Sequence, residues 1–352
     1  MTSRNYSFVV HWAIIVALVL PICQAHAVNY AILIGVNQYD NPKESEYPLG
    51  DLKYAGADME LLRKTLIEAR FITDERNVYL LTSETAKKPT RENILEAVDE
   101  VLKRITKKDN EDTVLFAFAG HGVQVDENGK VGDVLCCSDA KFNKDKDHEG
   151  IIFRSDLEKL FADRGPNNLR VLPKNKIFIL DACRNNPAWE EKTDSGSRSI
   201  RSLGNQPETD AQMSYPGIIR LASCSPRQVS REGTNNIKNG IFTHFLVEGL
   251  RGEADKKVNG GNGNGEIALD ELFFYARKKT SDLIVNQIPT KSEIEVDYPL
   301  SSVVMGKCNP EVSPERAPQS SQGSNTPSTQ RSVSPQRPGG SGGGFSNRTT
   351  TR

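Results

Sequence analysis

His121 and Cys183 are the two residues whose types and positions predict catalysis in this chain. Each follows a short apolar run, AFAGHG at His121 and IFILDAC at Cys183. A thiol attacks a carbonyl carbon as the thiolate, and a histidine that can hold the thiol proton supplies that thiolate near neutral pH. The pair therefore predicts a cysteine hydrolase, if the fold brings the two side chains together.

The elements that must position this pair are apolar runs that alternate with amphipathic helices. The predicted strands are 30–35, 78–81, 113–119, 176–180 and 217–222, and the predicted helices carry apolar stripes within 59–69, 94–105, 155–161, 242–250 and 269–276. This alternation predicts an α/β fold with a mostly parallel central sheet and helices on both faces. Ligands of such sheets bind beyond the carboxyl ends of the strands, where His121 and Cys183 fall. Ser155 and Glu158 predict a capping box for the third helix.

Backbone groups and the remaining cysteines complete the predicted site. Glycines flank His121, and the main-chain N–H groups of Gly122 and Cys183 predict an oxyanion hole. The cysteines after residue 27 are Cys136, Cys137, Cys183, Cys224 and Cys308. They are odd in number and lack the spacing of metal ligands. The apolar run VLCC predicts that Cys136 and Cys137 are buried, so Cys183 is the candidate reactive thiol.

The two ends of the chain differ in composition from the part between them. Residues 1–27 have a short polar start, an apolar stretch and a final AHA, which predict a secretory signal peptide cleaved after Ala27; an uncleaved anchor is the alternative. We therefore expect a secreted or periplasmic protein. Residues 309–352 are rich in Ser, Pro and Gly and predict a disordered tail after a domain at 28–308. The net charge of −1 favours neither nucleic acid nor a membrane as partner.

Several motifs occur in order along the chain: YAILIGVNQY, LKYAGAD, GHG at 120–122, LDACRNNP at 180–187, ASCSPRQVSREG and NGIFTHFL at 239–246. Together they resemble the caspase-like cysteine peptidases, in particular the bacterial metacaspase and orthocaspase branch. The resemblance implies a caspase-like fold, Cys183 as nucleophile, His121 as general base or acid, and polypeptide substrates. It also implies a large-subunit-like part to about 189, a mobile loop at 190–215 and a small-subunit-like part at 216–308.

Two aspartates bear on specificity. Side chains alternate on an extended segment, so Asp181 and Cys183 project to the same side. By the resemblance, Asp58 and Asp181 match the two pocket aspartates of metacaspase-like members, which implies cleavage after Arg or Lys. The alternative is that Asp58 caps or solvates a helix while Asp181 orients backbone.

The polar loop after Cys183 contains basic residues that a peptidase of this specificity would cut. Lys192, Arg198 and Arg201 are the candidate self-cleavage sites. The alternative is an ordinary surface loop whose charges keep it solvated.

Of the properties that the resemblance implies, a calcium requirement is the one that the sequence supports least. Many metacaspases need it, and their paired aspartates precede the helix at Asp156, where this chain has Arg154 and Ser155. Residues 260–271 have a spacing similar to that of an EF-hand loop, but the aspartates of its early positions are absent. We therefore expect a glycine-rich turn there. The sequence thus favours an enzyme without a cofactor, and a calcium requirement is the less favoured alternative. The rival function is an inactive caspase-like protein that binds peptides or acts as a scaffold, and the presence of both His121 and Cys183 favours the enzyme.

Overall fold

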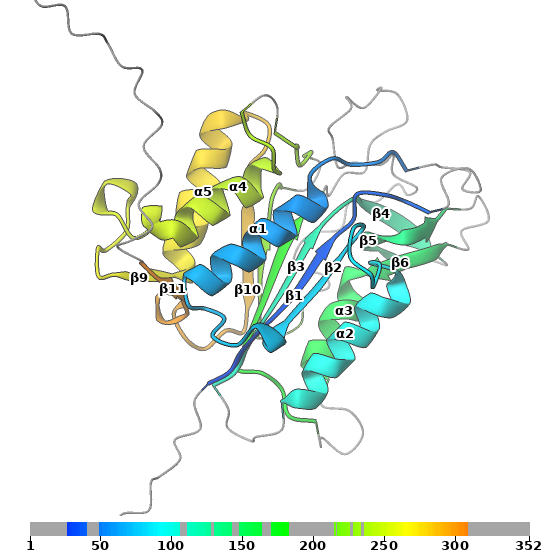
Figure 1. The fold of residues 1–352 in the computed structure, drawn as a ribbon, viewed down its shortest axis with the longest axis horizontal. Coiled ribbons are helices and arrows are strands. Elements are labelled where there is room, and N and C mark those ends of the chain that lie inside the picture. The colour runs from blue at the N-terminus through cyan, green and yellow to red at the C-terminus, as the bar shows by residue number, and fades with distance from the viewer. Residues whose placement is uncertain are drawn as a thin grey trace, which may run out of the picture. The chain divides into compact units, whose positions relative to one another are not determined.

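The structure is a computed structural model that describes residues 27–40, 49–105, 111–127, 130–142, 148–163, 170–182, 215, 217–225, 228–233 and 236–308. Within these residues a six-stranded sheet runs in the order β10-β8-β7-β3-β1-β2 (Figure 1). Its strands are β1 (Asn29–Gly35), β2 (Val78–Thr82), β3 (Thr113–Ala119), β7 (Asn175–Asp181), β8 (Ile218–Ala222) and β10 (Thr290–Ile294). All neighbours are parallel except β10, which pairs antiparallel with β8.

Helices cover both faces of this sheet, as the sequence predicts. One face carries α1 (Ala55–Glu68), α4 (Ile241–Glu248) and α5 (Leu269–Leu283), and the other carries α2 (Arg91–Arg104) and α3 (Arg154–Ala162) (Figure 1). Strand β1 shows why, because alternate side chains point to opposite faces: Ala31 and Leu33 join one core cluster, and Ile32 joins the other. The predicted α/β class with a mostly parallel central sheet is confirmed.

Two smaller sheets were not predicted. Strands β4 (Gly122–Glu127), β5 (Lys130–Lys141) and β6 (Glu149–Phe153) form an antiparallel sheet, called the small sheet below. Strands β9 (Glu266–Ala268) and β11 (Val304–Lys307) form an antiparallel pair. Short helical turns lie at Glu75–Asn77, Gly249–Glu253, Lys257–Asn259 and Leu300–Ser302. Because β4 begins directly after His121, the small sheet bears on the site.

The predicted capping box is wrong. Helix α3 begins two residues earlier than that pattern requires, with Phe153 as its N-cap and no side chain capping it. Ser155 and Glu158 both lie inside the helix and are buried. Glu158 instead forms ion pairs with arginines.

Several sequence predictions fall outside the described residues. These are the signal peptide up to residue 26, Cys183, the candidate self-cleavage sites Lys192, Arg198 and Arg201, most of the loop at 190–215, and the tail at 309–352. None of the helices in the described ranges has both the length and the apolar character needed to cross a membrane.

Candidate active site

His121 is held by contacts from three separate segments. It lies between the end of β3 and the start of β4, and its side chain is buried. Its main-chain N–H donates to the Tyr39 hydroxyl at 2.9 Å, and its carbonyl accepts from the Cys136 N–H at 3.0 Å. The Tyr39 and His121 rings lie 5.1 Å apart between centroids. These contacts fix both the backbone and the ring of the predicted catalytic histidine.

The tautomer of His121 follows from its ring contact. The Nε2 atom lies 2.7 Å from the Gly50 carbonyl oxygen. A carbonyl oxygen only accepts hydrogen bonds, so Nε2 carries the proton of the neutral imidazole. Nδ1 is then the nitrogen that can take up a proton. Sequence reasoning missed the Gly50 carbonyl, because a main-chain acceptor leaves no signal in the residue type, and it gave Tyr39 no role.

The strands that precede the two predicted catalytic residues are neighbours. Strand β3 pairs parallel with β7, with Ala119 opposite Asp181, and the Gly120 N–H donates to the Asp181 carbonyl at 3.4 Å. His121 lies two residues beyond Ala119, and Cys183 lies two residues beyond Asp181. The two strands are therefore neighbours, which is the condition under which His121 and Cys183 can meet.

Asp58 binds the start of α4. Its carboxylate accepts hydrogen bonds from the Gly240 N–H, at 3.0 Å to Oδ1 and 3.1 Å to Oδ2, and from the Asn239 side-chain amide at 2.9 Å. Gly240 is the N-cap of α4, and Asp58 is fully buried. A carboxylate at this end of a helix is stabilised by the unpaired N–H groups and by the helix dipole.

Asp181 binds the same helix one turn further along. Its Oδ2 accepts from the Thr243 hydroxyl at 2.6 Å and from the Thr243 N–H at 3.3 Å, and its Oδ1 accepts from the Ser230 hydroxyl at 2.6 Å. It is also fully buried. The structure therefore brings the two predicted pocket aspartates together at the N-terminus of α4. Their contacts there are the helix-capping and backbone-orienting ones of the alternative interpretation.

Glu232 is a third buried carboxylate in this region, and sequence reasoning missed it. It accepts from the Tyr54 N–H at 2.8 Å and from the Lys53 N–H at 3.1 Å, and Tyr54 is the N-cap of α1. The segment before α4 thus caps α1, while Asp58 of α1 caps α4. Three acidic side chains therefore lie around the starts of two helices that neighbour the His121 loop.

The described cysteines are poor nucleophiles. Burial raises the pKa of both Cys136 and Cys137, and Cys137 is further affected by the carboxylate of Asp139. Burial, followed by the hydrogen bond to Asp255, raises the pKa of Cys308 to about 11. Cys224 is buried with its thiol 3.4 Å from the Gln228 carbonyl oxygen. Since a thiol must ionise to attack, this supports Cys183 as the candidate nucleophile.

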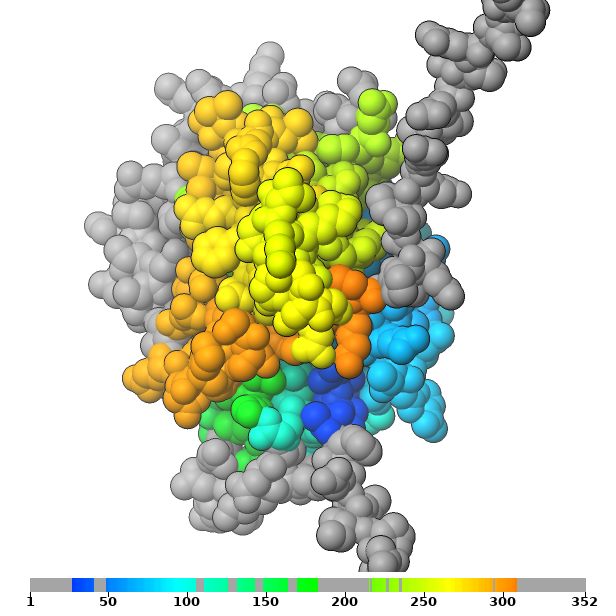
Figure 2. Space-filling model, turned by 90° about the vertical axis from the view of Figure 1, so that its left-hand side faces the viewer, coloured from blue at the N-terminus to red at the C-terminus, as the bar shows by residue number. Residues whose placement is uncertain are grey.

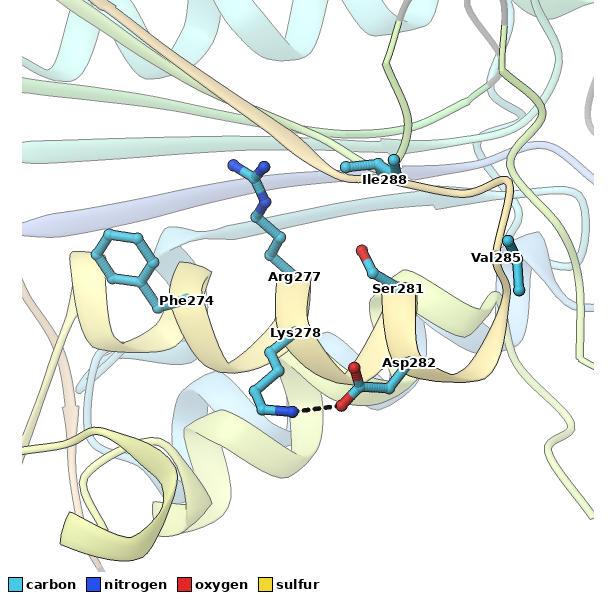
Figure 3. Close-up of a pocket in the computed structure, with 7 residues that line it drawn as sticks. All are labelled: Phe274, Arg277, Lys278, Ser281, Asp282, Val285 and Ile288. Carbon is cyan, nitrogen blue, oxygen red and sulfur yellow. Dashed lines mark hydrogen bonds and ion pairs between the residues drawn. The ribbon is translucent and has the colours of Figure 1, made fainter.

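A surface hollow of about 440 Å³ lies between α5 and the segment that leads to β10 (Figure 3). It is lined by Phe274, Arg277, Lys278, Ser281, Asp282, Val285 and Ile288. Lys278 and Asp282 form an ion pair across one helical turn at 2.5 Å. Of the site residues that the structure describes, His121, Asp58 and Asp181 do not line this hollow.

The EF-hand-like segment forms a glycine-rich turn, as expected. The Asn262 side-chain oxygen accepts from the Asn264 N–H at 2.9 Å, and the Asn264 side-chain oxygen accepts from the Glu266 N–H at 2.8 Å. Gly260, Gly263 and Gly265 all have positive φ, which side chains with a Cβ rarely adopt. The segment lies on the surface, in yellow in Figure 2. Its oxygens thus bind main-chain groups of the turn itself.

Comparison with known proteins identifies the family. The sequence profile of the caspase domain, a peptidase family, matches residues 28–293. The chain belongs to the caspase domain family. Membership of this family supports a cysteine peptidase in general, a hydrolase whose substrates are polypeptides.

Two solved structures are similar to this chain at low sequence identity, and the first of them agrees with this fold. A crystal structure of a structural-genomics target from Geobacter sulfurreducens is 16% identical over 80% of this chain and all of that one, with a TM-score of 0.53. Caspase-1 from Spodoptera frugiperda is 14% identical over 81% of this chain and 92% of that one, with a TM-score of 0.46. No curated protein matches the chain. The first likeness concerns the fold alone.

Proposed function

We propose that this protein is a cysteine endopeptidase in which His121 and Cys183 cleave peptide bonds after Arg or Lys. The observation that carries the proposal is the register of β3 against β7, because His121 and Cys183 follow adjacent parallel strands at equal distances. The carboxyl ends of such strands are where a parallel sheet binds its ligands. The burial of His121 and its hydrogen bonds to Tyr39 and Gly50 support the same assignment.

The proposed cycle uses these groups in sequence. His121 Nδ1 takes the proton of the Cys183 thiol, and the thiolate attacks the scissile carbonyl carbon. The main-chain N–H groups of Gly122 and Cys183 stabilise the oxyanion. His121 then gives its proton to the leaving amine, and water hydrolyses the acyl-enzyme. The Gly50 carbonyl stabilises the imidazolium that forms between these steps, since it accepts the Nε2 proton.

The specificity for Arg or Lys rests on Asp58 and Asp181. The partners of these two carboxylates include amide and hydroxyl groups, which stabilise the charged form of a carboxylate. A buried negative charge in this position favours a cationic substrate side chain over a neutral or acidic one. Both carboxylates are fully buried, so the substrate cation acts through the shell formed by Asn239 and Ser230 or displaces one of these side chains.

The same activity would act on the chain itself. Cleavage after Lys192, Arg198 or Arg201 would separate the part that carries His121 from the part that begins near Tyr215. The signal-peptide pattern assigns the mature enzyme to a secreted or periplasmic location and starts it at Val28. N-terminal sequencing of the exported and processed chains tests both assignments.

Peptide hydrolysis tests the proposal most simply. Wild-type protein should hydrolyse Arg- and Lys-ended fluorogenic peptides, with Asp-ended peptides cleaved far more slowly. Cys183→Ala and His121→Ala should each lower kcat by about 10⁴-fold or more. Cys308→Ser and His244→Gln are the matched controls and should keep wild-type rates. Absence of cleavage by folded wild-type protein would instead support the inactive, peptide-binding alternative.

A further inference from the structure

A buried cluster of opposite charges lies where the small sheet meets the central sheet. Among the residues that the structure describes, its charged members are Asp133 of β5, Arg154 and Glu158 of α3, and Arg220 of β8. Each is at least 91% buried, and Arg154 is among the largest fully buried side chains of the described residues. The two guanidinium groups and two carboxylates balance in formal charge.

The contacts within this cluster centre on Glu158. Its Oε1 accepts from Arg220 Nε at 2.9 Å, lies 2.6 Å from Arg220 Nη2, and accepts from Arg154 Nη1 at 3.1 Å. Arg154 Nε lies 3.5 Å from Asp133 Oδ2. The side-chain amide of Gln124 donates to the other oxygen of Asp133 at 2.9 Å. Arg154 thus links one carboxylate of the small sheet to one on the helix.

Arg154 lies at an unfavourable position in its helix, and its ion pairs explain how a cation is stable there. Arg154 is the first residue of α3, where the helix dipole disfavours a cation. A guanidinium there, taken out of water, is stable only with close carboxylate partners. Asp133 and Glu158 are such partners, and Arg220 shares the second of them.

These residues do not fit a calcium ion. The relatives that need calcium have paired aspartates at the start of this helix, whereas this chain has a guanidinium and a hydroxyl, at Arg154 and Ser155. Calcium requires six to eight oxygen ligands. Here the Asp133 and Glu158 carboxylates are paired with arginine, and a divalent ion would have to approach two guanidinium groups.

Two buried oxygens of the cluster have no hydrogen-bond partner among the described residues, the Glu158 Oε2 and the Ser155 hydroxyl. They are too few for a calcium site, and Oε2 belongs to the carboxylate that both arginines bind. No group of three or more His, Cys, Asp or Glu side chains suited to a metal occurs in the described ranges. The oxygen atoms of this cluster therefore suit a guanidinium group better than a calcium ion.

We propose that the Arg154 guanidinium supplies, as part of the chain, the positive charge that a bound divalent cation would supply at this position. It neutralises Asp133 and joins that residue through Glu158 to Arg220 of the central sheet. Asp133 pairs with Gln124 of β4, three residues after His121. The protein thus fixes the small sheet beside its histidine without calcium. This inference goes beyond the proposed function, and thermal unfolding tests it whether or not the protein cleaves peptides.

The first test compares the Tm of the full-length, chelator-treated protein with and without millimolar calcium, with magnesium as the control ion. A site filled to about 100 times its Kd would raise Tm by roughly 5 °C in a domain of this size. The proposal predicts equal Tm values in calcium, magnesium and chelator. A rise specific to calcium would overturn it.

The second test removes the cation itself. Arg154→Met keeps much of the side-chain volume but leaves Asp133 and Glu158 short of positive charge, and should lower Tm by roughly 10 °C. Arg154→Lys keeps the charge without the planar fork and should recover part of that loss. The exposed Arg251→Met is the matched control and should leave Tm unchanged. An Arg154→Met protein as stable as wild type would overturn the proposal, and Arg154→Lys keeps the test open if Arg154→Met fails to fold.

Discussion

Buried carboxylates are treated differently at the starts of α3 and α4. At α3, Glu158 and Asp133 are paired with the guanidinium groups of Arg154 and Arg220. At α4, the described donors to Asp58 and Asp181 are neutral amide and hydroxyl groups. Ion pairs cancel charge, whereas neutral donors stabilise a carboxylate and leave its charge in place. The difference distinguishes carboxylates that are paired with buried guanidinium groups from carboxylates that amide and hydroxyl groups bind at the start of a helix.

The largest expected effect comes from breaking the buried ion pairs of Glu158. Glu158→Ala leaves Arg154 and Arg220 buried without their shared partner and should lower the free energy of unfolding by about 3–5 kcal/mol. Denaturant unfolding measures this value. The surface pair of Lys87 and Glu96 is the matched control, and Glu96→Ala should cost less than about 1 kcal/mol. Equal effects from the two variants would remove the distinction between buried and exposed pairs.

A second change tests whether the charge of Asp181 acts on the substrate. Asp181→Asn keeps an acceptor oxygen for Ser230 or Thr243 but removes the charge. We expect kcat/KM for an Arg-ended peptide to fall about 100-fold, equivalent to about 2.7 kcal/mol. Cleavage of a peptide with a neutral residue at that position should change far less. An equal fall for both peptides would assign Asp181 a structural role alone.

Asp58→Asn should have a smaller effect on the preference for an Arg-ended peptide over a peptide with a neutral residue at that position. Both oxygens of Asp58 accept from the Gly240 N–H, so the amide keeps part of the helix cap. We expect the preference for Arg over a neutral side chain to fall about 10-fold, while the free energy of unfolding falls by about 1 kcal/mol. If Asp58→Asn lost stability but kept its preference for Arg over a neutral side chain, Asp58 would have a structural role alone.

The smallest expected effect concerns Asp255, a carboxylate that also binds neutral donors. It accepts hydrogen bonds from the main-chain N–H groups of Gly263, Asn264 and Gly265. Burial, followed by the hydrogen bond to Asp255, raises the pKa of Cys308 to about 11. The pKa of Cys308 in the folded protein lies above that of a free thiol. The protonated thiol of Cys308 therefore contributes its full stability below about pH 8.5, and this contribution is lost as the pH rises toward 11.

Cys308→Ser should therefore lose less stability than wild type between about pH 9 and pH 11. Thermal unfolding across this range measures the difference. Parallel pH profiles for the two proteins would show that the folded protein does not raise the pKa of Cys308.

The central sheet could be predicted because its strands are continuous apolar runs, as β3 shows with seven buried residues in succession. Strand β10, TKSEI, could not, because an edge strand needs no apolar run. The cluster around Arg154 was equally hidden, since its members come from β5, α3 and β8 and only tertiary structure joins them. Both aspartates of the α4 start could be selected from the sequence, but their donors, such as Gly240 and Thr243, lie some 60 to 180 residues away along the chain.

Covalent labelling of Cys183 tests the central claim most directly. A thiol-reactive peptide probe that ends in Arg should modify wild-type protein once, at Cys183, as located by mass spectrometry of its peptides. The same probe ending in Asp should react far more slowly, and His121→Ala should suppress labelling because the thiolate is no longer formed. Labelling of another cysteine, or equal labelling by the Arg and Asp probes, would contradict the account.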